Sequence, residues 1–181
     1  KPSSAASDVY KRQDKEQANP VAYLCYKHEA IPNEQKGNMD YLVVNYMKSM
    51  IENMLNARLN ELTQTANPPF IFAQVRDQEF LISKTKDAFT GIVASKEDGI
   101  DSAITAIVRE IERVHKFGFT ASEYARAKAD YLRMLESAYN ERNKVKNGAY
   151  VDEYVRHFID NEPIPGIENE YAIMNQIVPN L

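Results

Sequence analysis

Histidine, cysteine and paired carboxylates are the residue types that could do chemistry in this chain of 181 residues. The three histidines are His28, His115 and His157, and no two of them have the spacing that places a pair of zinc ligands one helical turn apart. His28-Glu29 is the nearest approach to part of a zinc-peptidase motif, but no second histidine follows at the right interval. We therefore predict no metal ligand in this chain and expect all three histidines to be surface or structural residues.

Nucleophilic catalysis has no better basis in the sequence. The single cysteine, Cys25, lies in an apolar run, where a small buried hydrophobic residue is the expected role. No Gly-x-Ser-x-Gly elbow is present, and the six glycines are too scattered to build a phosphate-binding loop or a dinucleotide fingerprint. We predict no catalytic residue in this chain.

Carboxylate pairs occur on helix patterns that are rich in charge. Glu110 with Glu112 and Asp152 with Glu153 lie among basic residues. A solvated helix face with supporting ion pairs is a better interpretation than general acid–base catalysis.

Tyrosine is unusually frequent, with eleven residues against no tryptophan. Tyr139, Tyr150, Tyr154 and Phe158 cluster around Asn147-Gly148, which we expect to interrupt a helix. Amphipathic rings of this kind are typical of interfaces between domains or proteins. These four residues are our candidate interface, and a half-buried core is the alternative.

Composition excludes several classes of function. Apolar residues make up 44% and charged residues 27%, with a net charge of -4 and no basic block, so we expect no nucleic-acid partner. One cysteine cannot form an internal disulfide. No apolar run approaches the roughly 20 residues needed to span a bilayer.

Hydrophobic periodicity predicts an α+β fold. Residues 1–20 are predicted to be a disordered linker or tail, and 21–181 a single non-catalytic domain that is truncated at its C-terminus. The expected strands cover 21–27, 70–76 and 80–84, with a hairpin turn at Asp77-Gln78. Residues 89–94 either continue the last of these strands past a bend at Asp87 or form a further strand. The expected helices cover 38–62, 100–116, a third starting at 121, a shorter one after Asn147-Gly148, and 167–177. The order β-α-β-β-α-α with short C-terminal helices fits a two-layer sandwich, in which helices cover one face of a mostly antiparallel sheet.

Two segments of this pattern carry a family resemblance. The helix end Met54–Leu62 resembles the helix end of insulinase/pitrilysin-type zinc peptidases, in which Arg-Leu is followed by two residues and Glu-Leu, although a single residue separates Arg58-Leu59 from Glu61-Leu62 here. Pro68-Pro69 follows it as a turn does in that family. Phe117–Lys128 is similar to that family's Gly-x-Thr-x-x-Glu helix start, which ends in Ala-Lys. The resemblance covers roughly residues 21–177.

The resemblance implies a non-catalytic copy of a repeated half-domain, as found after the catalytic copy in large bacterial members. The helix 38–62 has no histidine, whereas the catalytic copy carries an inverted His-x-x-Glu-His helix, so no ligand or catalytic residue is carried over. The implied role is a structural, substrate-enclosing domain of a zinc endopeptidase that degrades or processes peptides. Its implied partners are the catalytic domain of the same parent chain, which would hold the zinc, and the enclosed peptide.

Two questions stay open at the level of sequence. A non-catalytic subunit or adaptor that binds a protein partner without protease activity is the alternative function. Whether the parent is an active enzyme, and in which compartment it works, is not fixed by this chain, although the resemblance implies a bacterial periplasm or cell envelope.

Overall fold

The computed structural model describes residues 19–80 and 83–181. Most of the linker predicted at 1–20 lies outside the described residues. The chain divides into two compact units: one comprises the residues up to Ala30 with Ile51–Thr120, and the other comprises Ile31–Met50 with Ala121–Leu181. Helix α1 (Met39–Thr63) contributes its first half to the second unit and its second half to the first. Among the described residues, no helix has the length and apolar character needed to cross a bilayer.

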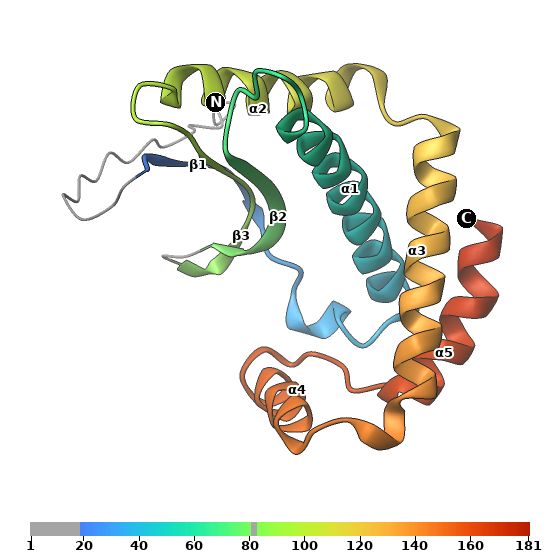
Figure 1. The fold of residues 1–181 in the computed structure, drawn as a ribbon. Coiled ribbons are helices and arrows are strands. Elements are labelled where there is room, and N and C mark those ends of the chain that lie inside the picture. Colours follow the sequence, from blue (N-terminus) through green and yellow to red (C-terminus); the bar gives the residue numbers. More distant parts are fainter. Residues whose placement is uncertain (1–18, 81–82) are drawn as a thin grey trace. The chain divides into compact units, whose positions relative to one another are not determined.

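An antiparallel three-stranded sheet organises the first unit. It consists of β1 (Val21–Glu29), β2 (Phe72–Phe80) and β3 (Ser83–Ala94), and β3 is the central strand (Figure 1). Both outer strands pair antiparallel with β3, and Leu24 and Val75 both lie opposite Gly91. The predicted α+β class with a mostly antiparallel sheet is confirmed.

The turn predicted at Asp77-Gln78 is wrong, because β2 continues through both residues as far as Phe80. The predicted hairpin itself is present, since β2 and β3 follow one another in the chain and pair antiparallel, with a register shift between Glu79 and Phe80. The residues expected at 89–94 continue the preceding strand, because Ser83–Ala94 form the single long strand β3.

Side chains of α1 close the outer edge of β2. The Asn56 amide accepts a hydrogen bond from the Val75 backbone N–H at 2.7 Å and donates to the Val75 carbonyl at 3.0 Å. Glu52 accepts from the Asp77 N–H at 2.8 Å. Four residues along a helix rise about 6.0 Å and two residues along a strand about 6.8 Å, so Glu52 and Asn56 match alternate residues of β2. An exposed strand edge, which would invite pairing with another chain, is thereby covered.

The core of the first unit lies between one face of the sheet and two helices. Leu55 and Leu59 of α1 and Ile107 of α2 (Ile100–Phe117) are buried against Val75 and Val93. Helix α2 approaches β3 so closely at Gly91 that an added Cβ atom would lie 3.0 Å from the Ile107 Cδ1 atom. The isoleucine stripe of α2 thus packs on the sheet as its periodicity predicted. Gly118 ends this helix with a positive φ of 67°.

Helices alone build the second unit. Besides the first half of α1, it contains α3 (Ala121–Asn140), α4 (Asn147–Asp160) and α5 (Gly166–Ile177). Three short 3-10 turns accompany them, at Asn33–Gln35, Arg142–Lys144 and Val178–Asn180. The helix break expected at Asn147-Gly148 falls earlier, because these two residues form the first turn of α4.

A tyrosine cluster holds part of this unit together. The Tyr46 ring meets the Tyr131 ring edge to face, with centroids 4.9 Å apart, and the Tyr46 hydroxyl lies 3.1 Å from that of Tyr124. Tyr41 donates a hydrogen bond to the Glu162 carboxylate, which also forms an ion pair with Lys36 at 3.2 Å. Buried hydroxyl groups are therefore satisfied within the unit.

Candidate functional site

Helix α4 presents a continuous apolar surface without any buried residue of its own. Tyr150, Tyr154 and Phe158 follow one another at four-residue spacing and are 40%, 59% and 91% exposed. Beside them runs a second apolar row, also exposed, consisting of Val151, Val155 and Ile159. We call these six residues the α4 apolar face.

The structure separates Tyr139 from the other three members of the predicted interface group. Tyr139 is half-buried on α3, where its ring stacks on that of Tyr171 from α5, with centroids 4.3 Å apart. The Arg142 guanidinium lies 4.2 Å from the Tyr139 ring centroid on the connection to α4. Tyr139 thus helps to hold α3 and α5 together, while Tyr150, Tyr154 and Phe158 share the surface of α4.

The α4 apolar face is suited to binding another protein surface. A helix of a globular protein ordinarily buries its apolar stripe against the core. Here the stripe faces outward, and Phe158 in particular has almost its whole side chain exposed. Contiguous exposed apolar surface of this kind marks an interaction site, and large aromatic side chains supply most of the binding energy in such sites.

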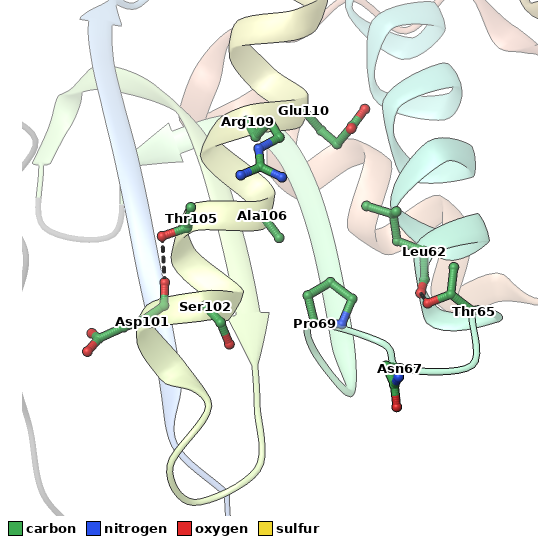
Figure 2. Close-up of a pocket in the computed structure, with 10 residues that line it drawn as sticks. All are labelled: Leu62, Thr65, Asn67, Pro69, Asp101, Ser102, Thr105, Ala106, Arg109 and Glu110. Carbon is green, nitrogen blue, oxygen red and sulfur yellow. Dashed lines mark hydrogen bonds between the residues drawn. The ribbon is translucent and has the colours of Figure 1, made fainter.

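The first unit contains a separate hollow of about 650 Å³ beside α2 (Figure 2). Leu62 and Thr65 at the end of α1, Pro69 in the following turn, and Ala106 on α2 supply part of its wall. Figure 2 shows the Arg109 and Glu110 side chains on the same stretch of α2, with Glu110 directed toward the α1 side.

Glu110 is the unusual member of this hollow. Its side chain is 10% exposed, its Oε2 atom has no hydrogen-bond partner, and the nearest cation is Arg113 with Nη1 at 3.5 Å. The sequence placed Glu110 on a solvated helix face, and that expectation is wrong. The stripe of Ala103 and Ile107 continues onto Glu110, so this carboxylate lies on the buried side of α2.

The hydroxyl groups around the hollow are not arranged for nucleophilic catalysis. Thr65 donates to the Leu62 carbonyl at 2.8 Å, and Thr105 donates to the Asp101 carbonyl at 2.8 Å (Figure 2). Ser102 donates to the Gly99 carbonyl at 2.8 Å. An activated hydroxyl must instead donate to a base such as histidine. These hydroxyls support the helix ends.

Two phenols in the second unit have raised pKa values that do not suit a general base. Burial, with a smaller contribution from the Glu170 carboxylate, raises the pKa of Tyr131 to about 12. Burial and then the hydrogen bond with Tyr124 raise the pKa of Tyr46 still further above its ordinary value. Both phenols stay protonated at neutral pH, whereas a general base works best with a pKa near the operating pH.

The histidines have different environments. His115 is exposed on α2, with Nδ1 4.0 Å from the Glu112 carboxylate, and His157 of α4 contacts the Glu162 carbonyl through Nδ1 at 2.6 Å. His28 lies on β1 with Nε2 2.8 Å from the Asp77 carboxylate, close to Asp87. Sequence reasoning missed this last group, because its members are 49 and 10 residues apart and only the pairing of strands brings them together.

Comparison with known proteins gives one relative in sequence. An Arabidopsis thaliana protein described as a zinc protease PQQL-like protein is 28% identical over 134 residues. The match covers 74% of this chain but 11% of that protein. No protein-family model matches the chain.

Solved bacterial structures share the fold. The periplasmic protease PqqL from Escherichia coli matches with a TM-score of 0.75 and 17% identity, over 92% of this chain and 18% of that one. A structure of the first half of the same protease gives a TM-score of 0.77 and 18% identity, over 92% of this chain and 35% of that one. A predicted insulinase family protease from Yersinia pestis gives a TM-score of 0.74 and 9% identity, over 93% of this chain and 35% of that one.

The chain therefore spans only a small part of the proteins it matches. Its similarity to the Arabidopsis relative is one of sequence, and its similarity to the bacterial structures is one of fold. Through both, the chain resembles the insulinase/pitrilysin-type zinc peptidases, as its two helix motifs predicted.

Proposed function

We propose that this chain is a non-catalytic domain of a zinc-dependent endopeptidase and docks on another domain of its parent through the α4 apolar face. The observation that carries the proposal is the exposure of Tyr150, Tyr154 and Phe158 on a helix with no buried residue. The chain covers 35% of the first half of a similar protease, so the domains that would cover such a face are expected elsewhere in the parent.

The parent's catalytic domain is the proposed partner, and peptide is the proposed substrate. The zinc belongs to that catalytic domain in this proposal, and the present chain forms part of the wall that encloses the peptide. The Escherichia coli neighbour is described as a periplasmic protease, which favours a periplasmic or envelope setting for a bacterial parent.

An adaptor that binds a protein partner and never joins a protease is the second candidate. The α4 apolar face would serve that role equally well, because an exposed aromatic surface specifies an interface but not its partner. The sequence of the parent gene distinguishes the two candidate functions. A His-x-x-Glu-His helix encoded in the same open reading frame supports the peptidase, and its absence supports the adaptor.

The docking role is tested in the full-length parent with Tyr154→Ser and Phe158→Ser. Removing an aromatic anchor from an interface commonly costs about 2 kcal/mol or more, so peptide cleavage should fall about tenfold or further. The zinc content should remain unchanged, because neither residue touches a metal site. Phe117→Ser is the matched control, since Phe117 is 81% exposed on α2 in the other unit.

Three outcomes decide the proposal. Reduced cleavage with normal zinc in the two α4 variants, and normal cleavage in Phe117→Ser, supports docking through α4. Full activity in both α4 variants removes the case for this interface. A full-length parent that holds no zinc and cleaves no peptide favours the adaptor.

A further inference from the structure

Three ligand-forming side chains meet at one end of the sheet in the first unit. His28 on β1 lies directly opposite Asp87 on β3, and Asp77 on β2 is paired with Phe89, two residues along β3 from Asp87. Side chains alternate between the faces of a strand, so His28, Asp77 and Asp87 share one face. One nitrogen of His28 and one oxygen of each aspartate lie within 4.8 Å of one another.

This face is the one that the helices cover. Leu24 and Tyr26 precede His28 on the same side of β1 and pack in the core, as does Val75 before Asp77 on β2. All three ligand-forming residues are consequently half-buried and not fully exposed. Glu52 of α1 holds the Asp77 backbone N–H at 2.8 Å, which fixes the position of this residue on the strand.

Both ring nitrogens of His28 lie beside oxygen atoms. Its Nδ1 atom lies 3.0 Å from the Glu29 carbonyl oxygen, and its Nε2 atom lies 2.8 Å from Asp77 Oδ1. A neutral imidazole has one N–H group, which can donate to only one of these two oxygens. If Nδ1–H donates to the carbonyl, the lone pair of Nε2 lies on the Asp77 side, where a metal ion would bind.

The same arrangement is typical of a metal-binding histidine. Such residues usually donate one ring N–H to a carbonyl or carboxylate, which fixes the tautomer and directs the other nitrogen to the ion. Here the Glu29 carbonyl lies beside Nδ1, Nε2 faces the Asp77 carboxylate, and the Asp87 carboxylate belongs to the same group. One imidazole nitrogen with two carboxylate oxygens suits Zn²⁺ and Mn²⁺, since imidazole favours the first and carboxylates the second.

We propose that His28, Asp77 and Asp87 bind one divalent transition-metal ion, Zn²⁺ or Mn²⁺, which links the ends of β1, β2 and β3. The proposal concerns residues of this chain alone and does not depend on the proposed function. Both carboxylates hold further contacts within the chain, so the ion competes with those contacts.

The test uses the whole chain after dialysis against a chelator. Isothermal titration with ZnCl₂ and separately with MnCl₂ should give one saturable site for at least one of the two ions. The His28→Gln and Asp87→Asn variants should each weaken binding about 10- to 100-fold, as loss of a metal-orienting group commonly does. Bound Mn²⁺ should also broaden the NMR signals of residues near His28.

His115→Gln is the matched control, because His115 also lies near a carboxylate but on an exposed helix. It should bind as the wild-type chain does. Circular dichroism of each variant without metal establishes that it is folded, and a variant that fails this check is replaced by Asp77→Asn. Absence of saturable binding of either ion at millimolar concentration overturns the proposal, and so does equal binding by folded His28→Gln. In either case the three side chains form a structural hydrogen-bonded group that holds no ion.

Discussion

The ionised carboxylate of Glu170 lowers the stability of the folded chain. It lies on α5, and burial, followed by repulsion from the Glu153 carboxylate, raises its pKa above the ordinary 4.5. The same carboxylate contributes to the raised pKa of Tyr131 on α3. Ionised Glu170 is therefore less favourable in the folded chain than in the unfolded chain.

Replacement of Glu170 by glutamine should remove this penalty. The folded-state pKa is raised, so the stability contribution of the protonated form is fully present below the unfolded pKa and is lost as pH rises through the folded pKa. Glu170→Gln cannot ionise and should unfold at higher urea concentration than the wild-type chain at neutral pH. The difference should vanish below the ordinary carboxyl pKa.

Glu168→Gln is the control on the same helix. Glu168 is exposed and forms an ion pair with Arg142 at 3.0 Å, so its replacement should not raise the unfolding midpoint. Identical pH profiles for Glu170→Gln and the wild-type chain would show that Glu170 has an ordinary proton affinity.

At the scale of elements, the contact between α1 and β2 explains how a long strand survives at the edge of the sheet. The amide of Asn56 satisfies both backbone groups of Val75, and Glu52 satisfies the backbone N–H of Asp77 on the same outer edge of the strand. These bonds carry β2 through Asp77-Gln78, residues that otherwise favour a turn. A helix thus supplies the hydrogen bonds that a further strand would supply.

Asn56→Ala should destabilise the chain by about 1–3 kcal/mol, because it leaves the two Val75 groups without these partners. Urea unfolding measures the cost, and the exchange rate of the Val75 amide hydrogen should rise. Asn60→Ala, one turn further along α1 at an exposed position, is the control and should have little effect. A midpoint shift no larger than that of the control, with unchanged exchange at Val75, would contradict the edge-capping role.

At the scale of the whole molecule, the described residues bring together no nucleophile, base and substrate hollow. The hydroxyls beside the hollow donate to backbone carbonyls, and the proposed metal site lies at the end of the sheet. The prediction that this chain holds no catalytic residue is therefore tested by assay of the chain itself.

The purified chain should accordingly hydrolyse no peptide, with or without added zinc. Catalysis requires a metal-bound water, a positioned general base and a bound substrate together, and a bound ion alone does not provide them. Cleavage of a mixed peptide library is followed by mass spectrometry. Chelator-sensitive cleavage that co-purifies with the folded chain would contradict this prediction.

The sequence by itself determined the fold class and most of the elements. The isoleucine stripe of 100–117 and the helix ending at Thr63 were predictable because the period of a helix places apolar residues on one face regardless of what that face contacts. The motif at one helix end and the motif at one helix start also carried the family resemblance. Both kinds of signal are local, so neither requires knowledge of distant contacts.

Tertiary structure alone decided the length of β2, the burial of Glu110, the stacking of Tyr139 on Tyr171 and the meeting of His28 with Asp77 and Asp87. Each of these depends on residues that are distant in the sequence, and no spacing rule predicts which they are. Asp77 stays in an extended strand because a side chain of α1 accepts a hydrogen bond from its backbone N–H. The Tyr139 ring stacks on Tyr171 only when α5 packs against α3. The physical reason is the same throughout: the contacts that settle these positions exist only after the chain has packed.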